Sequence, residues 1–213
     1  AVTALNANGI SGPVTFNVIA GHTETAPAGG FSITATGTAT NTITFQKSGP
    51  GANPTFTASN TLTAGALNDA IFKIIGGDYI TINGFTMQEN GLNTTTAAAS
   101  NNMTEWGVAL LYASATNGSQ NNTIQNCTIS LNRTYTNTWG IYSNVRHSAT
   151  SVGTTADITA ASGSNSNNKV YGNTISNVNM GIAFIGSGTA ANQDTGNDIG
   201  GSSALTGNTI TNW

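Results

Sequence analysis

The stretch Val170-Tyr171-Gly172-Asn173-Thr174-Ile175 decides the fold of this chain, because apolar and polar residues alternate along it and it closes on Thr-Ile. Related phrases occur at 82–87 (INGFTM), 124–129 (IQNCTI) and 206–210 (TGNTI). Alternation with a period of two predicts a strand with one buried face. Because the phrase returns at long intervals, the sequence predicts one structural unit that is stacked on copies of itself.

The composition is almost uncharged for a chain of 213 residues, a length that suits a single all-β domain. Charged residues make up 6% of the chain, against roughly 25% in an average globular protein, and the net charge is −3. The fixed cations are Lys47, Lys73, Arg133, Arg146 and Lys169. So few cations form no basic patch that would neutralise phosphates, so we expect no nucleic-acid partner.

The single cysteine, Cys127, excludes an internal disulfide and is expected to be buried filler within a repeat. No apolar run approaches the roughly 20 residues that span a bilayer, so we expect no membrane insertion. The chain starts at Ala1-Val2-Thr3 without a basic and hydrophobic leader, so an export signal is expected to have been removed or to lie outside this piece.

The repeats indicate a solenoid with enlarged loops. Their closing residues, Met87, Ile129, Ile175 and Ile210, lie farther apart than one coil of about 20–25 residues. Polar segments rich in Ser, Thr, Ala, Gly and Asn account for the difference, at 90–105, 144–168 and 186–197. We expect these segments to be surface loops of one body.

A second element follows each phrase and supplies the third strand of a coil. The segments 106–110 (WGVAL), 139–142 (WGIY) and 180–184 (MGIAF) share a large residue, a glycine and a short apolar run. Glycine suits a sharp corner. Three short strands per coil, without helical signals, predict an all-β, right-handed parallel β-helix of about five to six coils with long loop insertions. Residues 1–69 are expected to form less regular coils, and residues 70–213 regular ones.

Aligning the repeats predicts which side chains stack. Ile82, Ile124 and Val170 should form one inward column, and the closing residues Met87, Ile129, Ile175 and Ile210 another. Thr86, Thr128, Thr174 and Thr209 should form an outward column. Phe85, Cys127, Asn173 and Asn208 share the remaining inward position, where the two asparagines are expected to exchange amide hydrogen bonds.

The repeats, with an asparagine such as Asn173 or Asn208 near the tight turn, resemble the right-handed parallel β-helix of pectin-lyase-like proteins. The stretch 5–18 (LNANGISGPVTFNV), together with 41–46 (NTITFQ), resembles the opening of large secreted surface proteins of the Bacteroidota type. The resemblance implies export and a cell-surface location, and it implies little about activity.

Polysaccharide-cleaving members of this fold need clustered carboxylates, either to hold calcium or to act as acid and base. The acidic residues here are Glu24, Asp69, Asp78, Glu89, Glu105, Asp157, Asp194 and Asp198. None recurs at equivalent positions of adjacent repeats, and no Asp-Asp pair is present. We therefore assign no catalytic residue, and the sequence favours a protein that is not an enzyme.

Two further segments suggest a chemical role, but for each of them a simpler structural interpretation is favoured. The oxygen-rich loop 192–198, with Asp194 and Asp198, suggests calcium, although a polar turn without any cofactor is the favoured interpretation. Arg146 and His147 suggest acid–base chemistry, but both lie in a Ser/Thr-rich segment without a carboxylate near in sequence, which favours a solvated loop.

The large residues before the corner glycines predict a row of aromatic side chains, in which neighbours from successive coils lie about 4.8 Å apart. Trp106, Trp139 and Tyr142 are the candidate glycan-binding residues, since sugar rings present apolar faces to aromatic side chains. Trp213 is expected at the next corner, so the chain would stop in mid-coil as part of a longer protein. The favoured interpretation is nevertheless that the row only covers the corner and seals the end of the core, as large aromatic side chains often do.

The sequence thus favours a non-catalytic structural or adhesive segment of an extracellular cell-surface protein, with glycans, another surface protein or further copies of itself as partners. The alternative is the N-terminal part of a polysaccharide lyase or glycoside hydrolase whose catalytic coils lie outside this chain. Binding of ice or a crystal surface by the threonine column is disfavoured, because it needs flat arrays without long loops.

Overall fold

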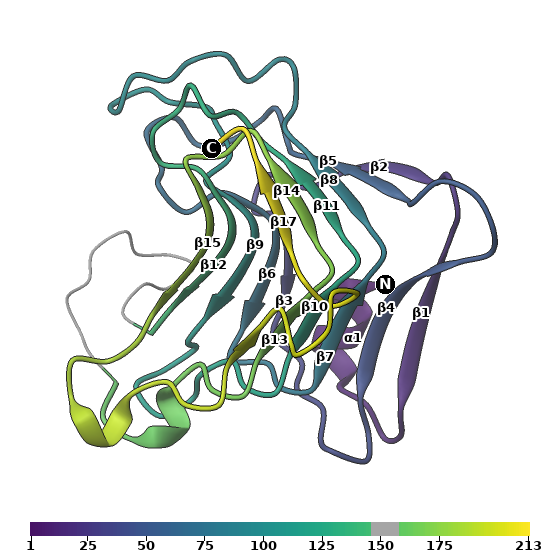
Figure 1. Cartoon of the computed structure of the whole chain (residues 1–213), viewed down its shortest axis with the longest axis vertical. Coiled ribbons are helices and arrows are strands. Elements are labelled where there is room, and N and C mark those ends of the chain that lie inside the picture. Colours follow the sequence, from purple (N-terminus) through teal and green to yellow (C-terminus); the bar gives the residue numbers. More distant parts are fainter. Residues whose placement is uncertain (146–157) are drawn as a thin grey trace.

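A computed structural model describes residues 1–145 and 158–213, and the strands in them form three parallel sheets (Figure 1). Sheet A contains, in spatial order, β1 (Val14–Ile19), β4 (Ile43–Ser48), β7 (Ile80–Asn83), β10 (Thr123–Gln125), β13 (Lys169–Tyr171) and β16 (Asp198–Ile199). Sheet B contains β2 (Thr23–Thr25), β5 (Thr55–Thr57), β8 (Thr86–Gln88), β11 (Thr128–Ser130), β14 (Thr174–Ser176) and β17 (Thr209–Thr211). Sheet C contains β3 (Phe31–Ile33), β6 (Ala70–Ile75), β9 (Trp106–Leu111), β12 (Trp139–Asn144) and β15 (Met180–Ile185).

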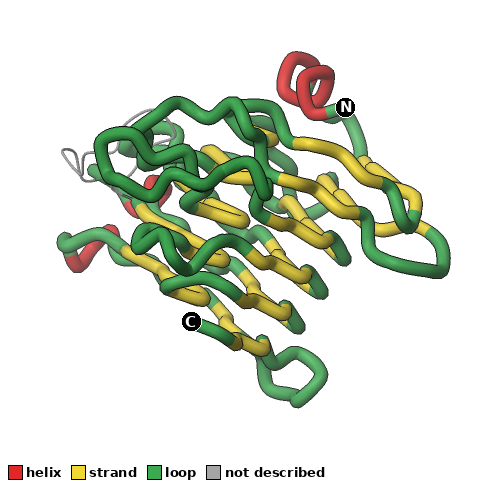
Figure 2. Tube along the Cα trace, turned by 90° about the horizontal axis from the view of Figure 1, so that it is seen from above, coloured by secondary structure: helices red, strands yellow, loops and turns green. Residues whose placement is uncertain are grey.

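The chain visits the three sheets in rotation, so each coil adds one strand to each sheet (Figure 2). Five coils are complete, and β16 and β17 begin a sixth. This order fits a parallel β-helix solenoid of the expected number of coils. The pairs β4–β7, β5–β8 and β3–β6 carry the sheets from the less regular N-terminal part into the regular part without a break.

The inward columns follow the register that the repeats predict. Ile124 pairs with Ile82 and Val170 in sheet A, and Ile129 pairs with Met87 and Ile175 in sheet B. All six of these side chains are 0–1% exposed. At the last coil, where a strand has a neighbour on one side only, the exposed fraction of Ile210 rises to 38%.

The predicted asparagine contact is confirmed. The Asn173 Nδ2 atom donates to Asn208 Oδ1 at 3.0 Å, and the backbone N–H groups of Cys127 and Asn173 each donate to the side-chain oxygen of the next coil. The residue with a left-handed backbone is the one directly before this inward position, since φ is 55° at Asn126, before Cys127, and 61° at Gly172, before Asn173. Asn173 itself is an inward rung, 1% exposed, with its amide hydrogen bonds satisfied within the stack.

Two further polar ladders line the corner that leads from sheet C into sheet A, and the sequence interpretation missed them. One runs through Asn122, Asn168 and Asn197, which stand directly before β10, β13 and β16. The other runs through Ser119, Asn165 and Asp194. In both ladders a backbone N–H of one coil donates to a side-chain oxygen of the next, at 2.8–2.9 Å.

The corner glycines Gly107, Gly140 and Gly181 are the second residues of β9, β12 and β15, and they serve close packing and not an unusual φ. A Cβ atom on Gly140 would lie 2.4 Å from Ile175 Cγ2 and 2.7 Å from the Gly181 carbonyl oxygen. Gly107 and Gly181 meet the equivalent isoleucines in the same way. The inward isoleucine of sheet B in the next coil therefore occupies the space that a side chain at the corner would need.

Contrary to the expectation of a chain without helices, the N-terminus forms helix α1 (Val2–Asn8), and short 3-10 turns occur at η1 (Ala161–Gly163) and η2 (Ala190–Asn192). Leu5 of α1 is 5% exposed, and Gly9 ends the helix at φ 62°. The Asn6 side chain donates to Ser32 O and accepts the Thr34 N–H, so α1 satisfies the free edge of β3. Tertiary contact with this edge holds a helix too short to be recognised from periodicity.

Trp213 does not take the corner position that the sequence predicts. Asn212 and Asn177 have matching left-handed backbones and are joined by a side-chain hydrogen bond. Trp213 is therefore the counterpart of Val178 and not of Met180, and it is 73% exposed.

Of the predicted loops, 90–105 joins sheets B and C and 186–197 joins sheets C and A, whereas 144–168 lies partly outside the described residues. Within the described chain, no helix has the length and apolar character needed to cross a membrane.

The register makes a direct stability prediction. Ile175 is fully buried and Thr174 is exposed on the opposite face. We expect Ile175→Asp to lower the free energy of unfolding by more than about 4 kcal/mol, because it places an unpaired charge in the core. Thr174→Ala should cost less than about 1 kcal/mol. Denaturant titration measures both, and equal losses would contradict the register.

Candidate functional site

The corner at which each coil enters sheet C brings together the residues with which the sequence suggests glycan binding. Ala70, Trp106, Trp139 and Met180 begin successive strands and are register partners. The row is aromatic in its two central coils. Tyr142 lies on the same outer face of β12 and leans back across the row toward Trp106.

Contacts among the three aromatic side chains form one stack. The rings of Trp106 and Tyr142 lie 4.7 Å apart between centroids with an interplanar angle of 6°, and Trp139 lies 5.4 Å from Tyr142. Trp106 is 1% exposed and Tyr142 5%, whereas Trp139 is half-buried and its Nε1 atom donates to Met180 Sδ at 3.0 Å. Only Trp139 and the exposed Met180 thus offer surface to a sugar ring. The inner part of the stack seals the corner.

A row of polar residues directly precedes the aromatic row and fixes its backbone. It consists of Asp69, Glu105, Thr138 and Asn179. The Asp69 carbonyl accepts the Trp106 N–H at 3.0 Å, the Glu105 carbonyl accepts the Trp139 N–H at 2.7 Å, and the Thr138 carbonyl accepts the Met180 N–H at 3.0 Å. We call these four residues the polar row.

Two members of the polar row are buried acids that hold each other in place. The Glu105 carboxylate accepts the Asp69 N–H and the Tyr135 hydroxyl, both at 2.8 Å. Glu105 is 0% exposed, Asp69 is 5% exposed, and Asp69 Oδ2 is buried without a hydrogen-bond partner. These carboxyl groups hold the corner and have no access to a polymeric substrate.

Burial dominates the electrostatics of this cluster. It raises the pKa of Glu105 from 4.5 to about 8, against the opposing effect of its hydrogen bonds. It also raises the pKa of Asp69 from 3.8 to about 6, and Lys73 opposes this shift. The pKa of Lys73, on β6, is lowered by burial and raised by the two carboxylates. Folding therefore favours the protonated form of both carboxyl groups relative to the unfolded chain.

Asp194 and Asp198, the candidate calcium ligands, have separate structural roles. Asp194 Oδ1 accepts the Asn165 N–H at 2.9 Å as the last rung of its ladder, and burial raises the Asp194 pKa to about 6. Asp198 is exposed and accepts the Tyr171 hydroxyl at 2.7 Å and the Gly201 N–H at 2.9 Å. Among the described residues, no group of three or more His, Cys, Asp or Glu side chains is placed to hold a metal ion. Arg146 and His147 lie outside the described residues.

Comparison with known proteins adds no family to this description: no protein-family model, no curated protein and no solved structure matches the chain. The assignment of roles therefore rests on the geometry of the corner itself.

The sequence contained a signal for the polar row that its interpretation did not use. Each large corner residue is directly preceded by a side chain that carries oxygen, as in Glu105-Trp106 and Thr138-Trp139. Alignment at these dipeptides would have grouped Glu105 with Thr138 and Asn179, whereas Asp69 precedes Ala70 and joins the row only through the register of β6 and β9. The hydrogen bond from Tyr135 to Glu105, in contrast, comes from the segment between β11 and β12, which belongs to no repeat.

The buried acids predict how stability depends on pH. A carboxyl whose pKa is higher in the folded than in the unfolded state stabilises the fold at low pH, and it loses that contribution as pH rises through the folded pKa. We expect the free energy of unfolding to fall between about pH 4.5 and about pH 8. In Glu105→Gln this fall should be smaller.

Urea titration at several pH values measures the effect, with Glu24→Gln, a substitution of an exposed acid, as the matched control. An unchanged slope in Glu105→Gln would show that Glu105 does not titrate in this range.

The ladder predicts that Asp194→Asn stabilises the protein at neutral pH. In the preceding rung, Asn165 Nδ2 donates to Leu110 O and Ser143 Oγ, whereas the corresponding Asp194 Oδ2 is buried without a partner. An amide at this position should gain about 0.5–1.5 kcal/mol. Thermal unfolding in EDTA and in calcium chloride tests this. Calcium stabilisation of the native chain that Asp194→Asn abolishes would instead assign the loop to calcium.

Proposed function

We propose that this chain is a non-catalytic structural segment of an extracellular, right-handed β-helical rod, and that its sheet C corner serves as an adhesive edge for glycans. The observation that carries the proposal is the register, which continues from the first coil to the last across three sheets. A stack of this kind resists bending, because each coil is bonded to its neighbours along three sides. The right hand follows the usual preference of parallel crossover connections.

The placement of the described acids supports a non-catalytic role. Asp69 and Glu105 form the buried corner, and Asp194 is a ladder rung. The Asp78 carboxylate accepts a hydrogen bond from the Gln120 N–H. The Glu89 carboxylate accepts hydrogen bonds from the backbone N–H and the hydroxyl of Thr104, so both acids hold loops in place. The carboxylates that bond within the fold are thereby committed to structure, which favours the rod over a lyase or hydrolase built on these coils.

The low charge and the threonine-rich outer faces support an extracellular scaffold that is hydrated without attracting charged partners. The resemblance of 5–18 and 41–46 to secreted surface proteins of the Bacteroidota type and of the repeats to pectin-lyase-like helices favours the same location. On the adhesive edge, Trp139 offers an aromatic surface and Met180 extends it, with 51% of Met180 exposed. Sugar rings stack on such a surface through their apolar faces.

Glycan-array binding tests the adhesive edge. We expect Trp139→Ala to lower binding by about tenfold, because the exposed aromatic surface is lost. Leu205→Ala, which removes a side chain that is 92% exposed elsewhere, is the matched control and should leave binding unchanged. Equal binding by the native chain and Trp139→Ala, with the melting temperatures of both variants retained, would remove glycan adhesion from the proposal.

Incubation with polygalacturonate, with and without calcium, tests the non-catalytic role separately. The rod should release no unsaturated ends and no reducing ends. Cleavage that is lost on removal of calcium would favour the lyase, and cleavage without calcium would favour a hydrolase.

A further inference from the structure

The first coils enclose a large open cavity, whereas the inward columns of the central coils are fully buried. The inward residues Phe16 and Val18 of β1 are half-buried, in contrast to Ile82 deeper in the same sheet, which is fully buried. A cavity of about 900 Å³ opens beside α1 at this end. In Figure 1, β1 and β4 lie on one side of this end of the molecule and β2 and β5 on the other.

Phenylalanine side chains form most of the apolar wall of the cavity. They are Phe16, Phe31, Phe45, Phe56, Phe72 and Phe85. Phe56 is the centre of the cluster, with ring centroids at 5.5 Å from Phe31, 5.2 Å from Phe72 and 4.9 Å from Phe85. Phe16 stacks on Phe45 at 4.7 Å. Because the rings hold one another, the wall exists before a ligand arrives.

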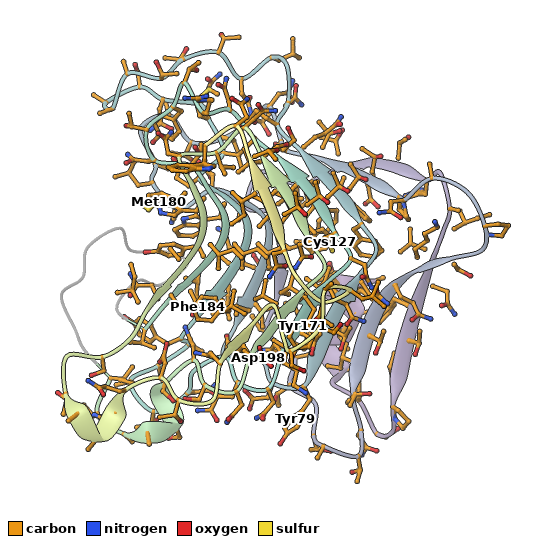
Figure 3. All side chains as sticks on the ribbon, viewed as in Figure 1. Tyr79, Cys127, Tyr171, Met180, Phe184 and Asp198 are labelled. Carbon is orange, nitrogen blue, oxygen red and sulfur yellow. The ribbon has the colours of Figure 1, made fainter. Side chains whose placement is uncertain are left out.

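One carboxylate faces this wall from an inward column. Glu24 of β2 is the register partner of Phe56, and the same column continues into Met87 in the next coil. An acid thus stands where later coils place an apolar side chain, and 49% of the Glu24 side chain is exposed. Its Oε2 atom lies 3.3 Å from His22 Nε2. Glu24 carries the only ionisable side chain among the residues that line the cavity, all of which the structure describes, and the α-amino group of Ala1 is the one cationic group in the same lining. Figure 3 shows the side chains on this part of the ribbon.

Size, wall and charge together select a class of ligand. A volume of this order suits a small organic molecule, and apolar walls with few polar groups are typical of such sites. Aromatic faces attract cations, and a carboxylate at the opening adds attraction for positive charge and repels anions. We infer that this cavity binds a small organic cation with an apolar body. Its body packs against the half-buried rings of Phe16 and Phe31, which the buried phenylalanines support, while its ammonium group lies at Glu24.

Isothermal titration calorimetry with benzyltrimethylammonium chloride tests the inference on the full chain. We expect saturable binding of one molecule per chain. Neopentylbenzene, the uncharged isostere, should bind at least about fivefold more weakly, and phenylacetate should not bind. No saturable binding of the cation, or binding of the neutral isostere with equal affinity, would overturn the inference.

Two substitutions in the wall identify the site. Glu24→Gln should weaken cation binding about fivefold, and Phe16→Leu should weaken it about threefold while keeping the wall apolar. Asp198→Asn at the opposite end of sheet A removes the same net charge and should change nothing. An equal loss in Asp198→Asn would reduce the effect to overall charge and contradict a site at Glu24. The melting temperature of each variant confirms that it is folded.

Discussion

The structure depends on one constraint: no coil can bury its own inward side chains. A coil of three short strands encloses a single layer of residues, and each layer is covered only by the layers on both sides. Ile129 is fully buried because Met87 and Ile175 occupy the same column above and below it. The hydrophobic contribution of any column therefore depends on register along the whole stack, which makes the fold cooperative between neighbours.

The same constraint governs the polar groups. A turn that enters the interior leaves backbone N–H groups without strand partners, and in this chain the next coil supplies a side-chain oxygen to each ladder rung. Asn168 shows the full pattern, since its N–H donates to Asn197 while its amide donates to Ser119. Buried amides and buried isoleucines thus specify the same register. At sheet C, the acids of the polar row extend this principle to the corner and make it sensitive to protonation.

The repeats predicted the three-strand coil, the inward columns and the Asn173–Asn208 contact, because those features recur with the coil and are visible in one alignment. Features that depend on one place in the stack were not predictable in this way. Helix α1 is held by the edge of β3, and Glu105 accepts a hydrogen bond from Tyr135, which lies outside the repeat. For the candidate glycan residues, the pattern placed Trp106, Trp139 and Tyr142 together, but only the structure shows that two of them are buried. The Trp213 position failed because the number of residues between the phrase and the corner differs from coil to coil.

Disulfide trapping measures the register of adjacent coils. In a Cys127→Ala background, cysteines at 128 and 174 replace register partners that are separated by one strand spacing of about 4.8 Å, which lies within the range of a disulfide. We expect this pair to form a disulfide on mild oxidation, as detected by peptide mass spectrometry, and a pair at 128 and 176 not to do so. Efficient bonding of the shifted pair, or none in the aligned pair, would contradict the stacked register.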